Sequence, residues 1–225
     1  MNSYYFNFWI ILYFFNSYLL KIDTNINRNY LSFAHSVSVS IISYFNIYYS
    51  INFLLHYISW TYFVWDTLYI LYNNIKNRNT KDFLYIYHHV ICLFALNQID
   101  NNINSNEINQ IFFYGEVSNF FNYIVYHLIK TKRSENKIII FKIIQLLHFC
   151  YFRIYIFTCL MFSIFPLFQN KFLKYNIFIL YLLGIFWGIK QFKNLLIYKK
   201  KIKAGCYQLL ENYRNFNFDI FKGVL

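Results

Sequence analysis

The stretch that decides the fold is residues 138–165, which read IIIFKIIQLLHFCYFRIYIFTCLMFSIF. An α-helix needs roughly 17–25 mostly apolar residues to cross the hydrocarbon core of a bilayer. This run exceeds that length, and its only side chains with a permanent charge are Lys142 and Arg153. Apolar residues follow one another without the two-residue alternation that a barrel strand would show. The stretch therefore predicts a membrane-spanning helix.

Further stretches of the same character precede and follow it, at about 4–20, 30–50, 54–72, 82–99, 108–129 and 175–198. The chain is 58% hydrophobic and 13% charged, whereas soluble domains carry about 25% charged residues. A soluble protein of this composition would expose large apolar patches, which monomers rarely do. We therefore predict an all-α, multi-pass transmembrane bundle of about seven spans. The composition argues against a nucleic-acid-binding domain, a secreted disulfide scaffold and a disordered chain.

The charges between these stretches predict an orientation. The net charge is +12, and cytoplasmic loops of membrane proteins carry an excess of Lys and Arg. Alternate connectors hold most of the basic residues, namely Lys21, Arg28, Lys76, Arg78, Lys81, Lys130, Lys132, Arg133, Lys137, Lys199, Lys200, Lys201 and Lys203. The other connectors hold Asp100, Glu107, Lys171 and Lys174. We predict that the amino terminus is lumenal or outside and that the carboxyl terminus is cytosolic.

Several polar side chains fall inside the predicted spans. An ionisable residue at the centre of a bilayer costs roughly 2.5–3.5 kcal/mol even on lenient insertion scales, so it usually faces the bundle interior. We expect a lipid-binding site or cavity lined by His35, Asp66, Glu116, Asn119 and Arg153. Arg153 is expected to pair with Glu116 or Asp66.

His88 and His89 are the candidate catalytic residues. Neighbouring helix positions point about 100° apart, so the two rings cannot share a face. A neutral imidazole at this depth acts as a base or holds a polar headgroup. The competing interpretation is that both are core histidines whose nitrogens bond to Asp, Ser or Asn on facing helices.

Other site chemistries lack their motifs. The six histidines do not form the HxxxH and HxxHH boxes of membrane di-iron enzymes. The sequence contains no GxGxxG, GxxxxGK[ST] or GxSxG pattern. We expect no metal site, no bound cofactor and no nucleic-acid partner.

The order of the polar landmarks resembles the TLC-domain proteins, which include the ceramide synthases and TRAM-like translocon proteins. The matching segments cover about residues 25–200 and are RNYLSFAHS (28–36), YFVWD (62–66), the pair His88–His89, GEVSNFFN (115–122), Arg153, and FWGIKQ (186–191) with Trp187 and Lys190. The resemblance implies a helical bundle around a lipid-accommodating cavity, in the endoplasmic reticulum or another internal membrane. It divides the chain into a first span and connector (1–24), a TLC-like transmembrane domain (25–204) and a cytosolic tail (205–225).

Three functions remain open at this stage. The first is lipid handling that alters membrane lipid composition. The second, implied by the ceramide synthase branch, is acyl transfer with acyl-CoA as co-substrate and His88 or His89 as the base. That branch carries an HDxxD-like acidic motif after the His pair, and this sequence does not. The third is a cargo or assembly receptor that acts through protein contacts.

Overall fold

The computed structural model describes residues 3–49, 52–77, 83–101 and 103–222, and within these ranges the chain is all-helical, without strands. The elements are α1 (Ser3–Phe14), η1 (Phe15–Leu19), α2 (Thr24–Tyr49), α3 (Asn52–Asn77), α4 (Phe83–Asp100), α5 (Ser105–Val117), α6 (Phe120–Lys130), α7 (Glu135–Phe149), η2 (Cys150–Ile156), α8 (Phe157–Ile164), η3 (Phe165–Leu167) and α9 (Lys171–Lys222). Each predicted apolar stretch is helical over most of its described length, so the predicted all-α class is confirmed.

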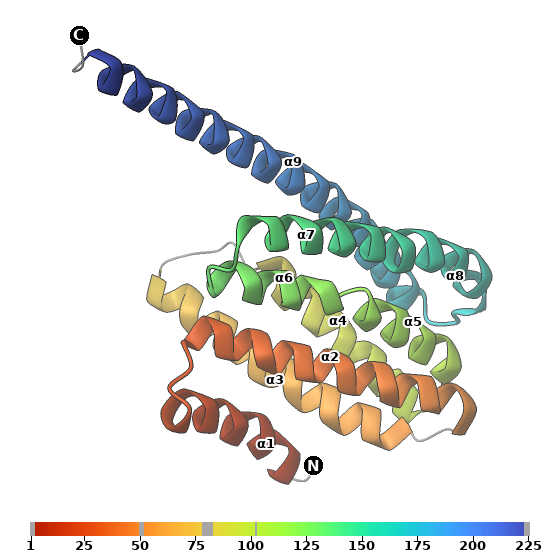
Figure 1. Ribbon diagram of the computed structural model, residues 1–225. Coiled ribbons are helices and arrows are strands. Elements are labelled where there is room, and N and C mark those ends of the chain that lie inside the picture. Colours follow the sequence, from red (N-terminus) through yellow and green to blue (C-terminus); the bar gives the residue numbers. More distant parts are fainter. Residues whose placement is uncertain (1–2, 50–51, 78–82, 102, 223–225) are drawn as a thin grey trace.

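The helices pack side by side (Figure 1), with α2 against α5 and α6, and α3 against α4 and α1. Helix α2 buries a stripe of small and polar residues that includes Ser36, Ser40 and Ser43. Small side chains let helix backbones approach closely. The Ser36 hydroxyl accordingly donates a 2.9 Å hydrogen bond to the backbone oxygen of Glu116 on α5. This close approach fixes the position of the end of α5, where the site described below begins.

Three predicted spans contain local breaks in the α-helix. The stretch 4–20 changes to π-helix over η1. The stretch 108–129 is divided into α5 and α6 by a turn at Ser118–Asn119, where the Ser118 hydroxyl donates a 2.6 Å bond to the Gly115 carbonyl. Such bonds from Ser to the preceding turn bend helices. The stretch 138–165 changes to π-helix over η2, and π-helical turns are frequent at functional sites.

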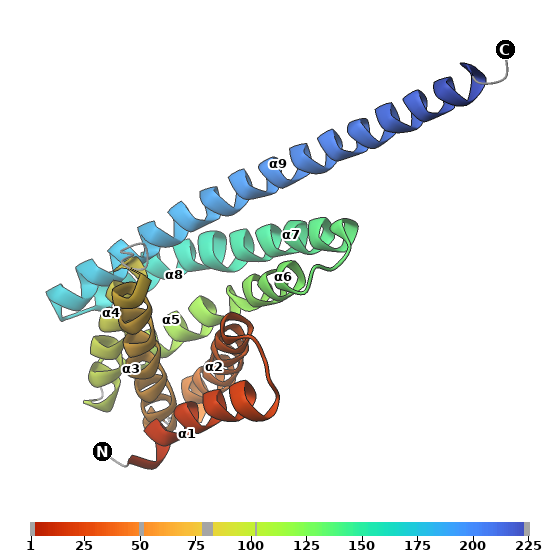
Figure 2. The same cartoon turned by 90° about the vertical axis from the view of Figure 1, so that its left-hand side faces the viewer.

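Helix α9 runs from Lys171 to Lys222 and projects well beyond the bundle (Figures 1 and 2). The structure therefore shows no helix end at the predicted boundary after residue 204. The loop residues Arg78 and Lys81 lie outside the described residues, and so do the side chains of Lys201 and Lys203.

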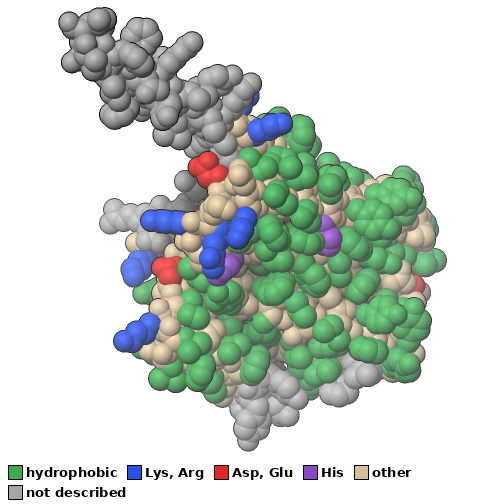
Figure 3. Space-filling view, in the orientation of Figure 1, with side chains coloured by type: hydrophobic (Ala, Val, Ile, Leu, Met, Phe, Trp, Pro, Cys, Tyr) green, Lys and Arg blue, Asp and Glu red, His purple; other side chains and the backbone are tan. Residues whose placement is uncertain are grey.

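Within the part of the chain that the structure describes, two helical segments are long and apolar enough to cross a membrane. They are Glu135–Leu167, with a mean hydropathy of 1.6, and Lys171–Lys200, with 1.7. Only 28% and 22% of their most apolar windows are buried, whereas the core helix of a soluble protein is mostly buried. Hydrophobic side chains cover most of the face in Figure 3, and Lys and Arg gather toward one end of it.

Candidate functional site

A pocket of about 50 Å³ lies between α4, α5, η2, α8 and α9. Its lining combines polar and apolar side chains, namely His88, Ile91, Cys92, Ala95, Ile108, Ile111, Phe112, Gly115, Glu116, Asn119, Arg153, Phe157, Ile177 and Leu180. Along α4, His88 precedes Ala95, and along the neighbouring α5, Ile108 precedes Glu116. Because a short connection makes these helices run in opposite directions, the polar lining lies at one end of the pocket and the apolar lining at the other.

Arg153 is the most unusual residue of the pocket. It is only 7% exposed, and its guanidinium lies over the Phe157 ring, 5.2 Å from the ring centre. Among the described residues, none accepts a hydrogen bond from the guanidinium or forms an ion pair with it. Buried polar groups in native proteins almost always have partners. The buried Nε–H of Arg153 has no acceptor in the chain, which marks the guanidinium as a group that can bind a partner from outside the chain.

Two glycines on different helices make room for the Arg153 side chain. A Cβ atom at Gly115 on α5 would lie 2.9 Å from Arg153 Nη1, and one at Gly184 on α9 would lie 3.0 Å from Arg153 Nε. Real Cβ atoms essentially never approach to less than 3.0 Å. The guanidinium thus occupies a slot between α5 and α9 that any larger residue at Gly115 or Gly184 would narrow.

Glu116 supplies the negative charge of the pocket. It is 7% exposed, and its Oε2 atom has no hydrogen-bond partner. The next polar lining residue, Asn119, is held by the Asn122 amide, which donates a 3.1 Å bond to Asn119 Oδ1. Asn122 in turn accepts bonds from Gln145 on α7 (2.7 Å) and Gln191 on α9 (3.2 Å). This amide network ties three helices together beside the polar end of the pocket.

His88 is the imidazole that lines the pocket. Its ring nitrogens contact Cys92 Sγ, one turn further along α4, at 3.7 and 3.9 Å. The edge of the ring faces Trp187 on α9, with 6.4 Å between ring centres. Because sulfur is a weak hydrogen-bond partner, His88 keeps most of its capacity to accept or donate a proton.

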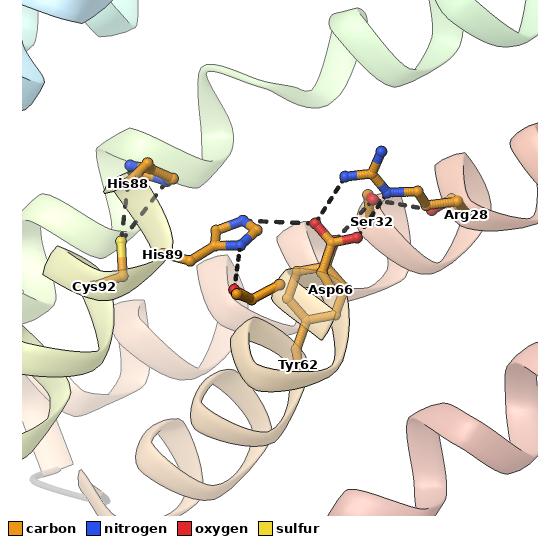
Figure 4. Close-up of polar contacts among 8 residues, drawn as sticks. Arg28, Ser32, Tyr62, Asp66, His88, His89 and Cys92 are labelled. Carbon is orange, nitrogen blue, oxygen red and sulfur yellow. Dashed lines mark hydrogen bonds and ion pairs between the residues drawn. The ribbon is translucent and has the colours of Figure 1, made fainter. Parts of the chain in front are cut away.

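His89 leaves α4 in a different direction from His88, as Figure 4 shows. Its Nδ1 atom lies 3.0 Å from the Thr67 hydroxyl, and its Nε2 atom lies 3.6 Å from Asp66 Oδ2. Asp66 also accepts two bonds from Arg28, at 2.7 Å from Nε and 3.0 Å from Nη2. The expectation that the two rings occupy different faces is therefore confirmed, and the core-histidine interpretation describes His89.

The same network continues along α2 and α3. The Tyr62 hydroxyl donates a 2.8 Å bond to Ser32 Oγ, and the Ser32 hydroxyl donates a 2.9 Å bond to the Arg28 carbonyl. We call the set Arg28, Ser32, Tyr62, Asp66, Thr67 and His89 the carboxylate network. His35 lies beside this network, with its ring stacked on Tyr62 at 3.8 Å between centres and its Nε2 atom without a partner.

The predicted site residues are thus divided between two regions. Glu116, Asn119, Arg153 and His88 line the pocket, whereas Asp66 and His89 belong to the carboxylate network and His35 packs against its tyrosine. The expected pairing of Arg153 with Asp66 is wrong, because Arg28 occupies both oxygens of that carboxylate. Glu116 lines the same pocket as Arg153, but the pair forms no ion pair within 4.0 Å.

Sequence reasoning missed several contributors to these regions. Arg28 was counted as a loop charge and as part of the segment 28–36, but not as a partner of Asp66. Thr67 and Cys92 were not given roles in the site, and Gly115 was named only as part of the segment 115–122. The available signal was helix spacing, since Thr67 follows Asp66 and Cys92 lies four residues after His88. No group of three or more His, Cys, Asp or Glu suited to a metal ion occurs in the part of the chain that the structure describes.

No family model matches the chain, and comparisons with curated proteins and with solved structures find no match either. The resemblance to TLC-domain proteins therefore rests on the quoted sequence landmarks alone.

Proposed function

We propose that this chain is a multi-pass membrane protein that handles lipids and thereby alters membrane lipid composition. The observation that carries the proposal is the pocket, in which the buried Nε of Arg153 and the buried Oε2 of Glu116 have no hydrogen-bond partners. The pocket lies among helices whose outward faces are apolar, as expected of a bundle surrounded by lipid. Nine of its fourteen lining residues are hydrophobic, which suits a ligand with a polar head and an apolar chain.

We further propose seven spans, with the amino terminus lumenal or outside and the carboxyl terminus cytosolic, in the endoplasmic reticulum or another internal membrane. The support is the positive-inside rule, since Lys76 lies in the last turn of α3, Lys130 ends α6 and Lys137 lies in the first turn of α7. Labelling of single cysteines added at residue 3 and residue 133 tests the orientation. Opposite accessibility in sealed vesicles is expected, and labelling of both from the same side would contradict it.

Lipid profiles of cells test the proposed function. Cells expressing the wild type, the double variant Glu116→Gln/Arg153→Met or an empty vector are compared by quantitative lipid mass spectrometry. Lys142→Met is the matched control, because it removes a partly exposed cation that lies over Tyr198 outside the pocket. The wild type and the control should share a profile that differs from the double variant and the vector. Identical profiles in wild-type and vector cells would contradict lipid handling.

A second candidate function is acyl transfer from acyl-CoA, with His88 as general base. It is favoured by the contrast between the two histidines, because His88 faces the pocket while His89 is bonded to Thr67 and faces Asp66. A neutral imidazole within reach of an acceptor O–H or N–H would take its proton as the acceptor attacks the thioester. The coenzyme A thiolate then leaves and takes up the proton.

Purified full-chain protein, incubated with labelled acyl-CoA and a panel of alcohol and amine acceptors, tests this second candidate. The wild type should form product, and His88→Gln should reduce the rate by about 100-fold or more. Folding of each variant is checked by its helical circular dichroism. Failure of the folded wild type to form product with any acceptor would exclude acyl transfer, as would full activity of His88→Gln.

A further inference from the structure

We propose that the pocket binds the carboxyl group of a single-chain lipid, a fatty acid, between Arg153 and Glu116. This inference rests on the proposed lipid-handling function and names the ligand of its site.

The first argument is the match of hydrogen-bond partners. Arg153 offers donors without acceptors, and Glu116 Oε2 is an acceptor without a donor. Leaving such groups unpaired in a buried site costs about 1–3 kcal/mol each, and more when they are charged. A carboxyl group satisfies both, because its carbonyl oxygen accepts from the guanidinium and its O–H donates to Glu116. A planar group with two oxygens also suits the fork of an arginine.

The second argument is charge. The polar lining holds one cationic and one anionic group, Arg153 and Glu116, so it is balanced before the ligand enters. A ligand that added a full charge in this apolar surrounding would have to be compensated. A carboxylic acid that enters in its protonated form adds no net charge. It then shares its proton with Glu116. Two carboxyl groups that share one site hold a proton between them.

The third argument is size. A cavity needs about 10–15 Å³ of the same kind of space to hold one water molecule, so a pocket of about 50 Å³ has room for a carboxyl group and its first carbons. Ile111 and Leu180 line the pocket and are partly exposed. They offer an apolar path by which the rest of a single chain leaves toward the surrounding lipid.

The inference predicts a ranking of three probes of equal chain length, namely hexadecanoic acid, hexadecanamide and hexadecanol. Each is titrated against purified full-chain protein in lipid nanodiscs, with radiolabelled hexadecanoic acid as the displaced tracer. The acid should bind most tightly, and Glu116→Gln/Arg153→Met should weaken its binding by about 10- to 100-fold, as expected for loss of hydrogen bonds to charged groups. Lys142→Met should bind as the wild type does. Gly184→Ala, which narrows the slot around Arg153 Nε, provides a second variant if the double variant does not fold.

The outcomes separate this inference from the function on which it rests. Tighter binding of the amide or the alcohol than of the acid would overturn the carboxyl assignment, while the function would still be supported by saturable, pocket-dependent lipid binding. Equal binding of the acid by the wild type and by the folded pocket variants would overturn the site itself. The lipid profiles of cells then decide the function independently of the ligand.

Discussion

The carboxylate network and the pocket are built from the same kinds of residue, yet they differ in how far these residues satisfy one another. In the network, Asp66 receives two bonds from Arg28 and faces His89, whose other ring nitrogen lies against Thr67. In the pocket, Arg153 makes no bond to a described residue, and Glu116 Oε2 has no partner. The difference indicates that the network stabilises the fold and that the pocket is available to bind a ligand.

The two regions also differ in the space around their arginines. Arg28 lies near the beginning of α2, and its side chain is 30% exposed. Arg153 lies in a slot made by Gly115 and Gly184, next to a cavity. The charged groups of the carboxylate network bond to one another and leave no space for a ligand. The pocket has both empty space and a hydrogen-bond donor without an acceptor. The predictions below change one region at a time, from the largest expected effect to the smallest.

Asp66→Asn should be the most damaging single change. Removing one partner of a buried charge pair costs about 3–5 kcal/mol, and we expect about 3 kcal/mol because Arg28 can turn partly toward water. The free energy of unfolding is measured by titrating purified protein in mixed micelles with a denaturing detergent. The control Glu135→Gln, at an exposed site in the first turn of α7, should change it by less than about 0.5 kcal/mol. Equal stability of Asp66→Asn and the control would contradict a structural role for the network.

The double variant Glu116→Gln/Arg153→Met should have the opposite effect on stability. Replacing buried charges by neutral side chains of similar volume is often neutral or stabilising by about 1–4 kcal/mol, and we expect a gain of about 1 kcal/mol in the absence of added lipid. The same unfolding titration measures it. A loss comparable to that of Asp66→Asn would mean that the pocket is as structural as the network.

Tyr62→Phe removes one hydroxyl from the carboxylate network. The lost 2.8 Å bond to Ser32 should cost about 1 kcal/mol in unfolding free energy, because Ser32 keeps its bond to the Arg28 carbonyl. Lipid binding should not change. Weaker binding of hexadecanoic acid by this variant would show that the two regions are coupled.

Gly184→Ala sharpens the description of the pocket. Its Cβ would lie 3.0 Å from Arg153 Nε and 3.2 Å from Cγ, so the guanidinium must shift. We expect hexadecanoic acid to bind about threefold more weakly. A loss of about 1.4 kcal/mol in binding free energy weakens binding tenfold, and the shift of the guanidinium should cost only part of one hydrogen bond to the acid. Gly188→Ala is the matched control on the same helix, because its Cβ would meet only Ile154 and Phe149. If the two substitutions weakened the binding of hexadecanoic acid equally, the weakening could not be due to the displacement of Arg153.

The helices were predictable because long apolar runs leave few other structures, and each predicted stretch is helical over most of its described length. The turn at Ser118–Asn119 and the π-helix η2 were not, since they depend on local bonds such as that from Ser118 to Gly115. The sequence showed that His88 and His89 face different ways. It did not show which of them meets Asp66, because that depends on how α4 packs against α3.

The composition of the pocket was predictable only in part. Buried charges inside an apolar chain are conspicuous, so Glu116 and Arg153 were expected to line a cavity. The roles of Gly115 and Gly184 follow from contacts between helices that are far apart in sequence, and no local sequence pattern predicts such contacts. Arg28 was missed because it lies just before the apolar part of α2, where a cation is expected at the membrane surface.

The most direct test of the account is the lipid that purifies with the protein. Full-chain wild type, Arg153→Met and Lys142→Met are purified in parallel, and bound lipid per chain is measured by mass spectrometry after denaturation. The account predicts a fatty acid near one molecule per chain in the wild type and in Lys142→Met, and its loss from folded Arg153→Met. The same lipid content in all three proteins would contradict it.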